Sequence, residues 1–110
     1  MEKINRRYID WEKTGMNLRE LRERNDPLIR YACFICHYNE GNCDGECERC
    51  RYSKGLDPQI TRKELARVFN TTETVILNWE RGTTPVPLDD IFYYCQIAKM
   101  TLDEILVYTE

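Results

Sequence analysis

The sequence predicts an all-α protein that folds as one domain. Apolar residues recur three and four positions apart along most of the chain, which is the spacing of one helix face. The pattern Thr-x-x-Glu, a common start of helices, occurs at Thr61 and again at Thr101. No stretch has the alternation of a convincing strand, and 110 residues is the length of a single domain with one modest core.

The first two helices are expected at residues 10–25 and 27–37. Asp26 is the expected N-cap of the second helix, because Pro27 follows it and proline fits the first helical position. One side of the first helix carries Trp11, Gly15, Leu18 and Leu21. The broad apolar face of the second comprises Leu28, Ile29, Ala32, Cys33, Ile35 and Cys36.

Two short helices are expected at residues 61–69 and 73–82. Thr61 and Glu64 form a capping box at the start of the first, and Asn70 after it tolerates the left-handed turn conformation. Thr72 caps the second helix, and Gly82 ends it. The expected buried residues are Leu65, Ala66 and Phe69 in the first helix and Val75, Ile76 and Trp79 in the second.

The C-terminal part predicts one more full helix and a final capped segment. Residues 85–87, Pro-Val-Pro, form a stiff connector, and the helix at 88–99 has an apolar stripe of Leu88, Ile91, Phe92 and Cys95. The aromatic residues expected in the core are Trp79, Phe92 and Tyr94. The helix that starts with the capping box at Thr101, residues 101–108, provides either a dimer surface or a segment that closes the core.

The stretch TRKELARVFNTTETVILNWERG, residues 61–82, resembles the helix-turn-helix of the lambda-repressor-like, or Cro-like, family. Ala66 matches the family's small residue in the first helix of the motif, and Asn70 stands where the turn glycine is usual. Ile76 and Trp79 match the two buried positions of the recognition helix. The resemblance extends to the first helix and to the segment after residue 85, and it implies a five-helix bundle that binds DNA.

Two features depart from the family. Residues 26–60 stand where the family connects its first two helices by a few residues, and they are predicted to form an inserted Cys-rich helix and loop within the single domain 1–110. Arg62 replaces the Gln that commonly opens the second helix. A guanidinium can hold a phosphate, but it reads bases differently from an amide.

The recognition helix implied by the resemblance spans residues 72–81, and its outward positions are those not buried against the core. Asn78 suits an adenine edge, Arg81 a guanine or a phosphate, and Leu77 a thymine methyl. Glu73 either accepts from a cytosine amino group or repels the duplex. The predicted DNA-contacting residues are Arg62, Lys63, Thr72, Glu73, Thr74, Leu77, Asn78, Arg81 and Thr83.

Five cysteines and the single histidine fall within residues 33–50. The spacings Cys-x2-Cys and Cys-x3-Cys-x2-Cys suit a structural zinc ion, with the fourth ligand from Cys33, Cys36 or His37. A helical Cys33 and Cys36 can instead be core residues, and the loop cysteines can be thiols without a metal. Sulfur ligation also suits an iron–sulfur cluster. The candidate ligands are Cys33, Cys36, Cys43, Cys47 and Cys50.

The function expected from this pattern is sequence-specific regulation of transcription, with repression the expected mode, by a homodimer bound to double-stranded DNA. The net charge of −3 does not oppose it, because residues 59–84 hold four basic against three acidic side chains. The alternatives are a protein-interaction adaptor on the same scaffold and a redox-sensing iron–sulfur regulator. No catalytic motif is present, so we expect no enzyme, and without an apolar leader or span we expect a cytoplasmic protein away from membranes.

Overall fold

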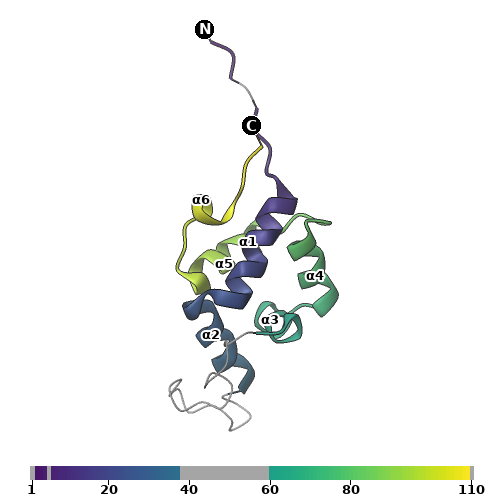
Figure 1. Cartoon of the computed structure of the whole chain (residues 1–110), viewed down its shortest axis with the longest axis vertical. Coiled ribbons are helices and arrows are strands. Elements are labelled where there is room, and N and C mark those ends of the chain that lie inside the picture. The colour runs from purple at the N-terminus through teal and green to yellow at the C-terminus, as the bar shows by residue number, and fades with distance from the viewer. Residues whose placement is uncertain (1, 5, 38–59, 110) are drawn as a thin grey trace.

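The computed structural model describes residues 2–4, 6–37 and 60–109, with only the backbone of His37 among them. Every regular element in these ranges is a helix, which confirms the all-α prediction for this part of the chain (Figure 1). The helices are α1 (Trp11–Arg24), α2 (Asp26–His37), α3 (Arg62–Phe69), α4 (Glu73–Arg81), α5 (Leu88–Ala98) and α6 (Leu102–Ile105). No described helix is both long and apolar enough to span a membrane.

The cap of α2 lies one residue earlier than expected. The Asn25 side chain accepts the backbone N–H of Leu28 at 2.9 Å, and Asp26 is already the first helical residue. Asn caps as well as Asp, but its amide also donates, here to the carbonyl of Ala98 at 3.2 Å. This second bond ties the start of α2 to the end of α5, and a carboxylate cannot make it.

The predicted caps and ends of α3 and α4 are confirmed. Thr61 and Glu64 form the capping box of α3, and Asn70 ends the helix in the left-handed region with φ 55°. The Thr72 side chain caps α4, which ends at Gly82 with φ 73°. Residues 70–72 therefore join two helices whose ends are set by short-range hydrogen bonds.

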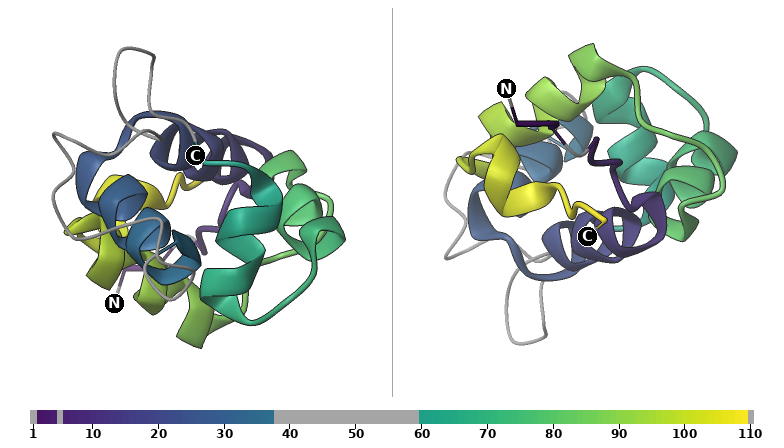
Figure 2. Two further views of the ribbon diagram at one scale, coloured as in Figure 1. Left: turned by 90° about the horizontal axis from the view of Figure 1, so that it is seen from below. Right: turned by 90° about the horizontal axis from the view of Figure 1, so that it is seen from above.

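The helices surround a common core (Figure 2), with α2 and α6 on one side and α3 and α4 on the other. The side chains of Leu18, Leu65 and Ile76 in this core have no exposed surface. The ring of Phe69 lies between those of Tyr93 and Tyr94, at centroid distances of 5.0 and 4.5 Å. Aromatic packing thereby joins α3 to α5.

The buried face of α5 differs from the predicted stripe. Leu88 is 64% exposed and Phe92 is 45% exposed, so the prediction of Phe92 in the core is wrong, whereas Trp79 and Tyr94 are buried as predicted. Helical spacing alone did not decide which side of α5 is buried. Leu88 and Tyr94 each lie one turn from Ile91, so a stripe with Leu88 and Phe92 and a stripe with Tyr94 both fit the pattern. The residues that α5 buries are Ile91, Tyr94, Ile97 and Ala98.

The C-terminal helix is shorter than expected. It ends at Ile105, and Leu106 is already extended. The chain then runs beside the N-terminal segment, where Val107 accepts the N–H of Asp10 at 2.7 Å and Ile9 and Tyr108 form an isolated antiparallel bridge. Ile105 is fully buried, so this end of the chain helps to close the core, which was one of the two roles expected for residues 101–108.

Candidate nucleic-acid interface

Helix α4 separates an inward face from an outward face. Ile76 and Trp79 are buried against the core, and Val75 packs partly against it. The residues predicted to contact DNA lie away from that side: Glu73, Thr74 and Arg81 are exposed, and Leu77 and Asn78 are half-buried. In Figure 1 the helix lies at the edge of the molecule, so its outward face is open to a partner.

Two of the threonines predicted to contact DNA, Thr72 and Thr83, flank α4. Thr72 is exposed, and its hydroxyl accepts the N–H of Val75 at 3.4 Å. Thr83 is exposed as well, and its backbone N–H donates to the carbonyl of Asn78 at 3.0 Å. The Thr72 side chain and the Thr83 backbone are therefore held at the two ends of α4.

The start of α3 carries the other two predicted phosphate contacts. Lys63 is exposed, whereas the Arg62 side chain is 31% exposed and its Nε donates to Glu80 at 3.0 Å. The sequence predicted that Arg62 contacts DNA through a guanidinium that can hold a phosphate, and it gave no indication of an internal partner. Its side chain instead lies between the surface and a carboxylate at the end of α4.

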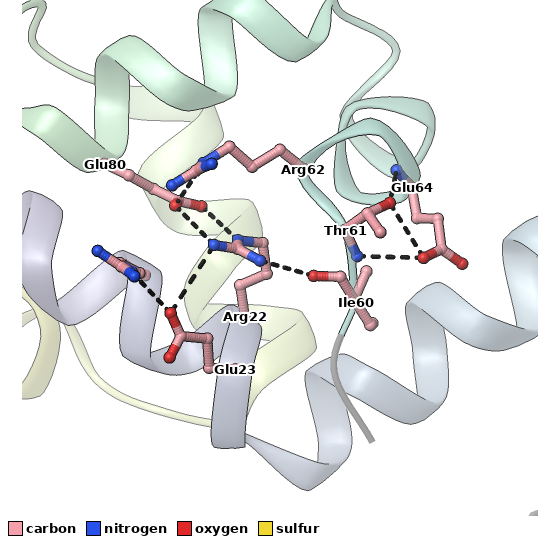
Figure 3. Close-up of polar contacts among 8 residues, drawn as sticks. Arg22, Glu23, Ile60, Thr61, Arg62, Glu64 and Glu80 are labelled. Carbon is pink, nitrogen blue, oxygen red and sulfur yellow. Dashed lines mark hydrogen bonds and ion pairs between the residues drawn. The ribbon is translucent and has the colours of Figure 1, made fainter. Parts of the chain in front are cut away.

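Glu80 is the centre of a buried cluster of charges (Figure 3). Its carboxylate accepts Nε of Arg22 at 2.8 Å and Nη2 of Arg22 at 3.1 Å, as well as Nε of Arg62. The remaining Nη1 of Arg22 donates to the carbonyl of Ile60 at 2.8 Å. Residues from α1, α3 and α4 thus meet at one carboxylate, whose side chain is 1% exposed.

The role of Glu80 was not predicted from the sequence. A signal was present, because Glu80 follows the buried Ile76 by four positions and residues four apart share one helix face. A carboxylate on a buried face requires basic partners. The sequence alone does not say which of the sixteen Lys and Arg residues supply them.

Tyr94 is the third polar residue of this buried region. Burial raises the pKa of its phenol well above the usual range, and the nearby carboxylate of Glu80 raises the pKa further. Its hydroxyl has no hydrogen-bond partner among the described residues. The interior beside the Arg22–Glu80 pair therefore favours a neutral tyrosine.

The predicted metal ligands fall into two groups. Cys36 is buried in α2, and its thiol donates to the carbonyl of Glu64 at 3.3 Å, while Cys33 is half-buried. Cys43, Cys47 and Cys50 lie outside the described residues. Among the residues that are described, no group of three or more His, Cys, Asp or Glu side chains is placed to hold a metal ion.

Comparisons with protein-family models, curated proteins and solved structures found no match for this chain.

Proposed function

We propose that the chain is a sequence-specific DNA-binding regulator of the lambda-repressor-like kind, with α4 as its recognition helix. The observation that carries the proposal is the α3–α4 pair. Two capped helices are joined by residues 70–72, and the second buries Ile76 and Trp79 while its polar side chains face outward. A helix presented in this way fits the major groove of DNA.

In this proposal, five of the helices correspond to the family bundle and the sixth to the insertion. Helices α1, α3, α4, α5 and α6 follow the family order, and α2 belongs to residues 26–60. One such small domain covers too little DNA for an operator, whereas a homodimer bound to two half-sites would cover enough.

The decisive experiment is selection of binding sites from random double-stranded DNA, followed by titration at several salt concentrations. Affinity must fall as the salt concentration rises, because phosphate contacts release counterions. Asn78→Ala should relax the preference for one base pair by about 1–3 kcal/mol. Gln96→Ala removes an exposed amide from α5 and should leave the preference unchanged. Absence of binding to any DNA at low salt would refute the proposal.

A zinc ion bound by the cysteine residues of 33–50 is part of the same proposal, as a stabiliser of the insertion. Elemental analysis of the purified protein tests it, with about one zinc per chain expected for a closed structural site. Iron and sulfide in place of zinc, with visible absorbance, would favour the redox-sensing alternative.

A protein-interaction adaptor is the second candidate function. Leu88 and Phe92 favour it, since they lie one turn apart on the outside of α5 and are 64% and 45% exposed. A double change to Ser at these two positions distinguishes the candidates. It should leave the DNA affinity of the proposed regulator unchanged and abolish the binding of a partner that docks on this face.

A further inference from the structure

We infer that Glu80 is a positioning residue, which holds Arg62 so that its outer amino groups bind a phosphate of the DNA backbone. This inference rests on the proposed DNA-binding function and assigns Glu80 a part in it. It adds a partner to the sequence prediction, which named Arg62 as a DNA contact and assigned no role to Glu80. The cluster in Figure 3 supplies the argument.

The two arginines use their donors differently. Arg22 directs Nε and Nη2 to Glu80 and Nη1 to Ile60, and its side chain is 9% exposed. Arg62 gives Glu80 only its Nε, and its side chain is 31% exposed. Arg22 is therefore committed to the interior, whereas no described residue accepts a hydrogen bond from the outer amino groups of Arg62, which can bind a ligand at the surface.

The charges of the cluster lead to the same assignment. The ion pairs around Glu80 join the guanidinium groups of Arg19, Arg22 and Arg62 to the carboxylates of Glu23 and Glu80, and guanidinium groups are always protonated in proteins. The cluster thus has one positive charge in excess. Because Arg22 lies inside and pairs with Glu80 through two hydrogen bonds, the excess charge is presented by Arg62 at the first residue of α3.

The capping box uses two of the backbone N–H groups at the start of α3, so a side chain there adds donors for a phosphate. The N–H of Glu64 bonds to the hydroxyl of Thr61, and the N–H of Thr61 bonds to the carboxylate of Glu64. These two backbone donors are occupied, and the carboxylate of Glu64 adds negative charge at this end of α3. A fixed guanidinium with two parallel donors overcomes that charge better than a mobile ammonium.

A Coulombic effect and a positioning effect predict opposite results for Glu80→Gln. Removal of a negative charge beside DNA should by itself strengthen binding. If Glu80 positions Arg62, the same change should weaken binding, because Gln has one acceptor oxygen and no charge, so the charge-assisted bond that orients the guanidinium is lost. The direction of the change in affinity therefore decides between the two.

The test is a double-mutant cycle in the full-length chain with Glu80→Gln, Arg62→Gln and both changes, titrated with mixed-sequence duplex DNA over a range of salt concentrations. Arg62→Gln should weaken binding roughly tenfold and reduce the slope of log K against log salt by about 1. Glu80→Gln should also weaken binding, and the double variant should be no weaker than Arg62→Gln. Arg30→Gln, an exposed arginine on α2, is the matched control.

A second change, which keeps the positive charge at position 62, tests the same positioning role. Arg62→Lys retains one positive charge but cannot bond to Glu80 and present two donors to a phosphate at once. We expect it to weaken binding while the salt slope stays near that of the wild type. Circular dichroism confirms that each variant is folded at the assay temperature.

The outcomes separate the inference from the proposed function. A wild-type chain that binds no DNA at low salt refutes the proposed function. A wild-type chain that binds DNA, together with a folded Glu80→Gln variant of equal or higher affinity, overturns the positioning role alone. If Glu80→Gln does not fold, a folded Arg62→Lys variant with wild-type affinity overturns the positioning role instead.

Discussion

Few polar side chains are buried in the described core, and the only buried side-chain N or O atom there without a hydrogen-bond partner is the hydroxyl of Tyr94. Glu80 and Arg22 form a pair in which both side chains are at most 9% exposed. Two charges removed from water are tolerated only when their hydrogen bonds are satisfied, as they are here. Single changes in this region should therefore have large effects on the free energy of unfolding.

Arg22→Met should lower the free energy of unfolding by about 3 kcal/mol, because it leaves Glu80 buried with only the single bond from Arg62. Urea denaturation followed by circular dichroism measures the change. Arg19→Met is the control, since Arg19 pairs with Glu23 on the exposed side of the same helix and should shift the midpoint little. An equal loss of unfolding free energy in the two variants would show that the buried Arg22–Glu80 pair stabilises the fold no more than the exposed Arg19–Glu23 pair.

Tyr94→Phe should raise the free energy of unfolding by about 1 kcal/mol. It removes a buried hydroxyl that has no partner among the described residues, and burial of such a group is costly. Tyr93→Phe should not stabilise the protein, because the Tyr93 hydroxyl donates to that of Tyr31 at 3.2 Å. Chemical denaturation of both variants provides the comparison, and destabilisation by Tyr94→Phe would contradict the structure of this site.

Tyr93 should also make the protein sensitive to alkali. Burial and then the hydrogen bond with Tyr31 raise its pKa from 10.0 to about 12. A raised pKa means that the unfolded chain loses the proton first, so stability is fully present below pH 10 and falls as the pH rises toward about 12. Denaturation midpoints over this interval should decline less steeply in Tyr93→Phe than in the wild type.

At the scale of elements, α1 and α4 approach each other closely. A Cβ added at Gly15 would lie 2.5 Å from the carbonyl oxygens of Trp79 and Glu80. The glycine on the predicted apolar side of α1 is therefore the point at which the backbones of the two helices meet. The same contact places Arg22, two turns along α1, against Glu80.

Gly15→Ala should lower the free energy of unfolding by about 2 kcal/mol, because the two helices must move apart. Helix propensity alone predicts the opposite sign, a gain of about 1 kcal/mol for Ala over Gly. Thermal or urea denaturation decides the sign. Met16→Ala, at an exposed neighbouring position, should change stability little. A stabilised Gly15→Ala variant would be incompatible with the observed crossing.

The elements also show how far sequence reasoning reached. The ends of α3 and α4 were predictable, because each depends on a hydrogen bond between residues about three positions apart, such as that from Glu64 to Thr61. The exposed face of α5 was not, because Leu88 and Tyr94 fit the same helical spacing and only the neighbouring helices choose between them. Likewise, the outward residues of α4 were predicted from its buried residues, whereas the partner of Arg62 was not.

For the whole molecule, the two ends of the described chain are joined by hydrogen bonds. Tyr8 accepts the N–H of Thr109 at 2.7 Å, and the hydroxyl of Thr14 accepts the N–H of Val107 at 2.9 Å. Thr14 is fully buried in α1, so its hydroxyl anchors the C-terminal segment to the first helix. This connection completes the core around Ile105.

Thr14→Val keeps the shape of the side chain but removes the acceptor for Val107. It should lower the free energy of unfolding by about 1–2 kcal/mol, since a partly buried N–H is left without its bond. Hydrogen exchange at Val107 should become faster in the same variant. Thr109→Val alters an exposed hydrogen bond of the same segment and should have a smaller effect. Unchanged exchange at Val107 would show that Thr14 does not hold this end.

The sequence by itself determined the helical class and the points where α3, α4 and α6 begin, because capping is a contact between residues three positions apart. Only the tertiary structure decided which charges meet in the interior. Arg22 and Glu80 are 58 residues apart in the chain and become partners because Gly15 lets α1 and α4 approach closely. Local hydrogen bonds are visible in a linear pattern, whereas a buried ion pair depends on how whole helices pack.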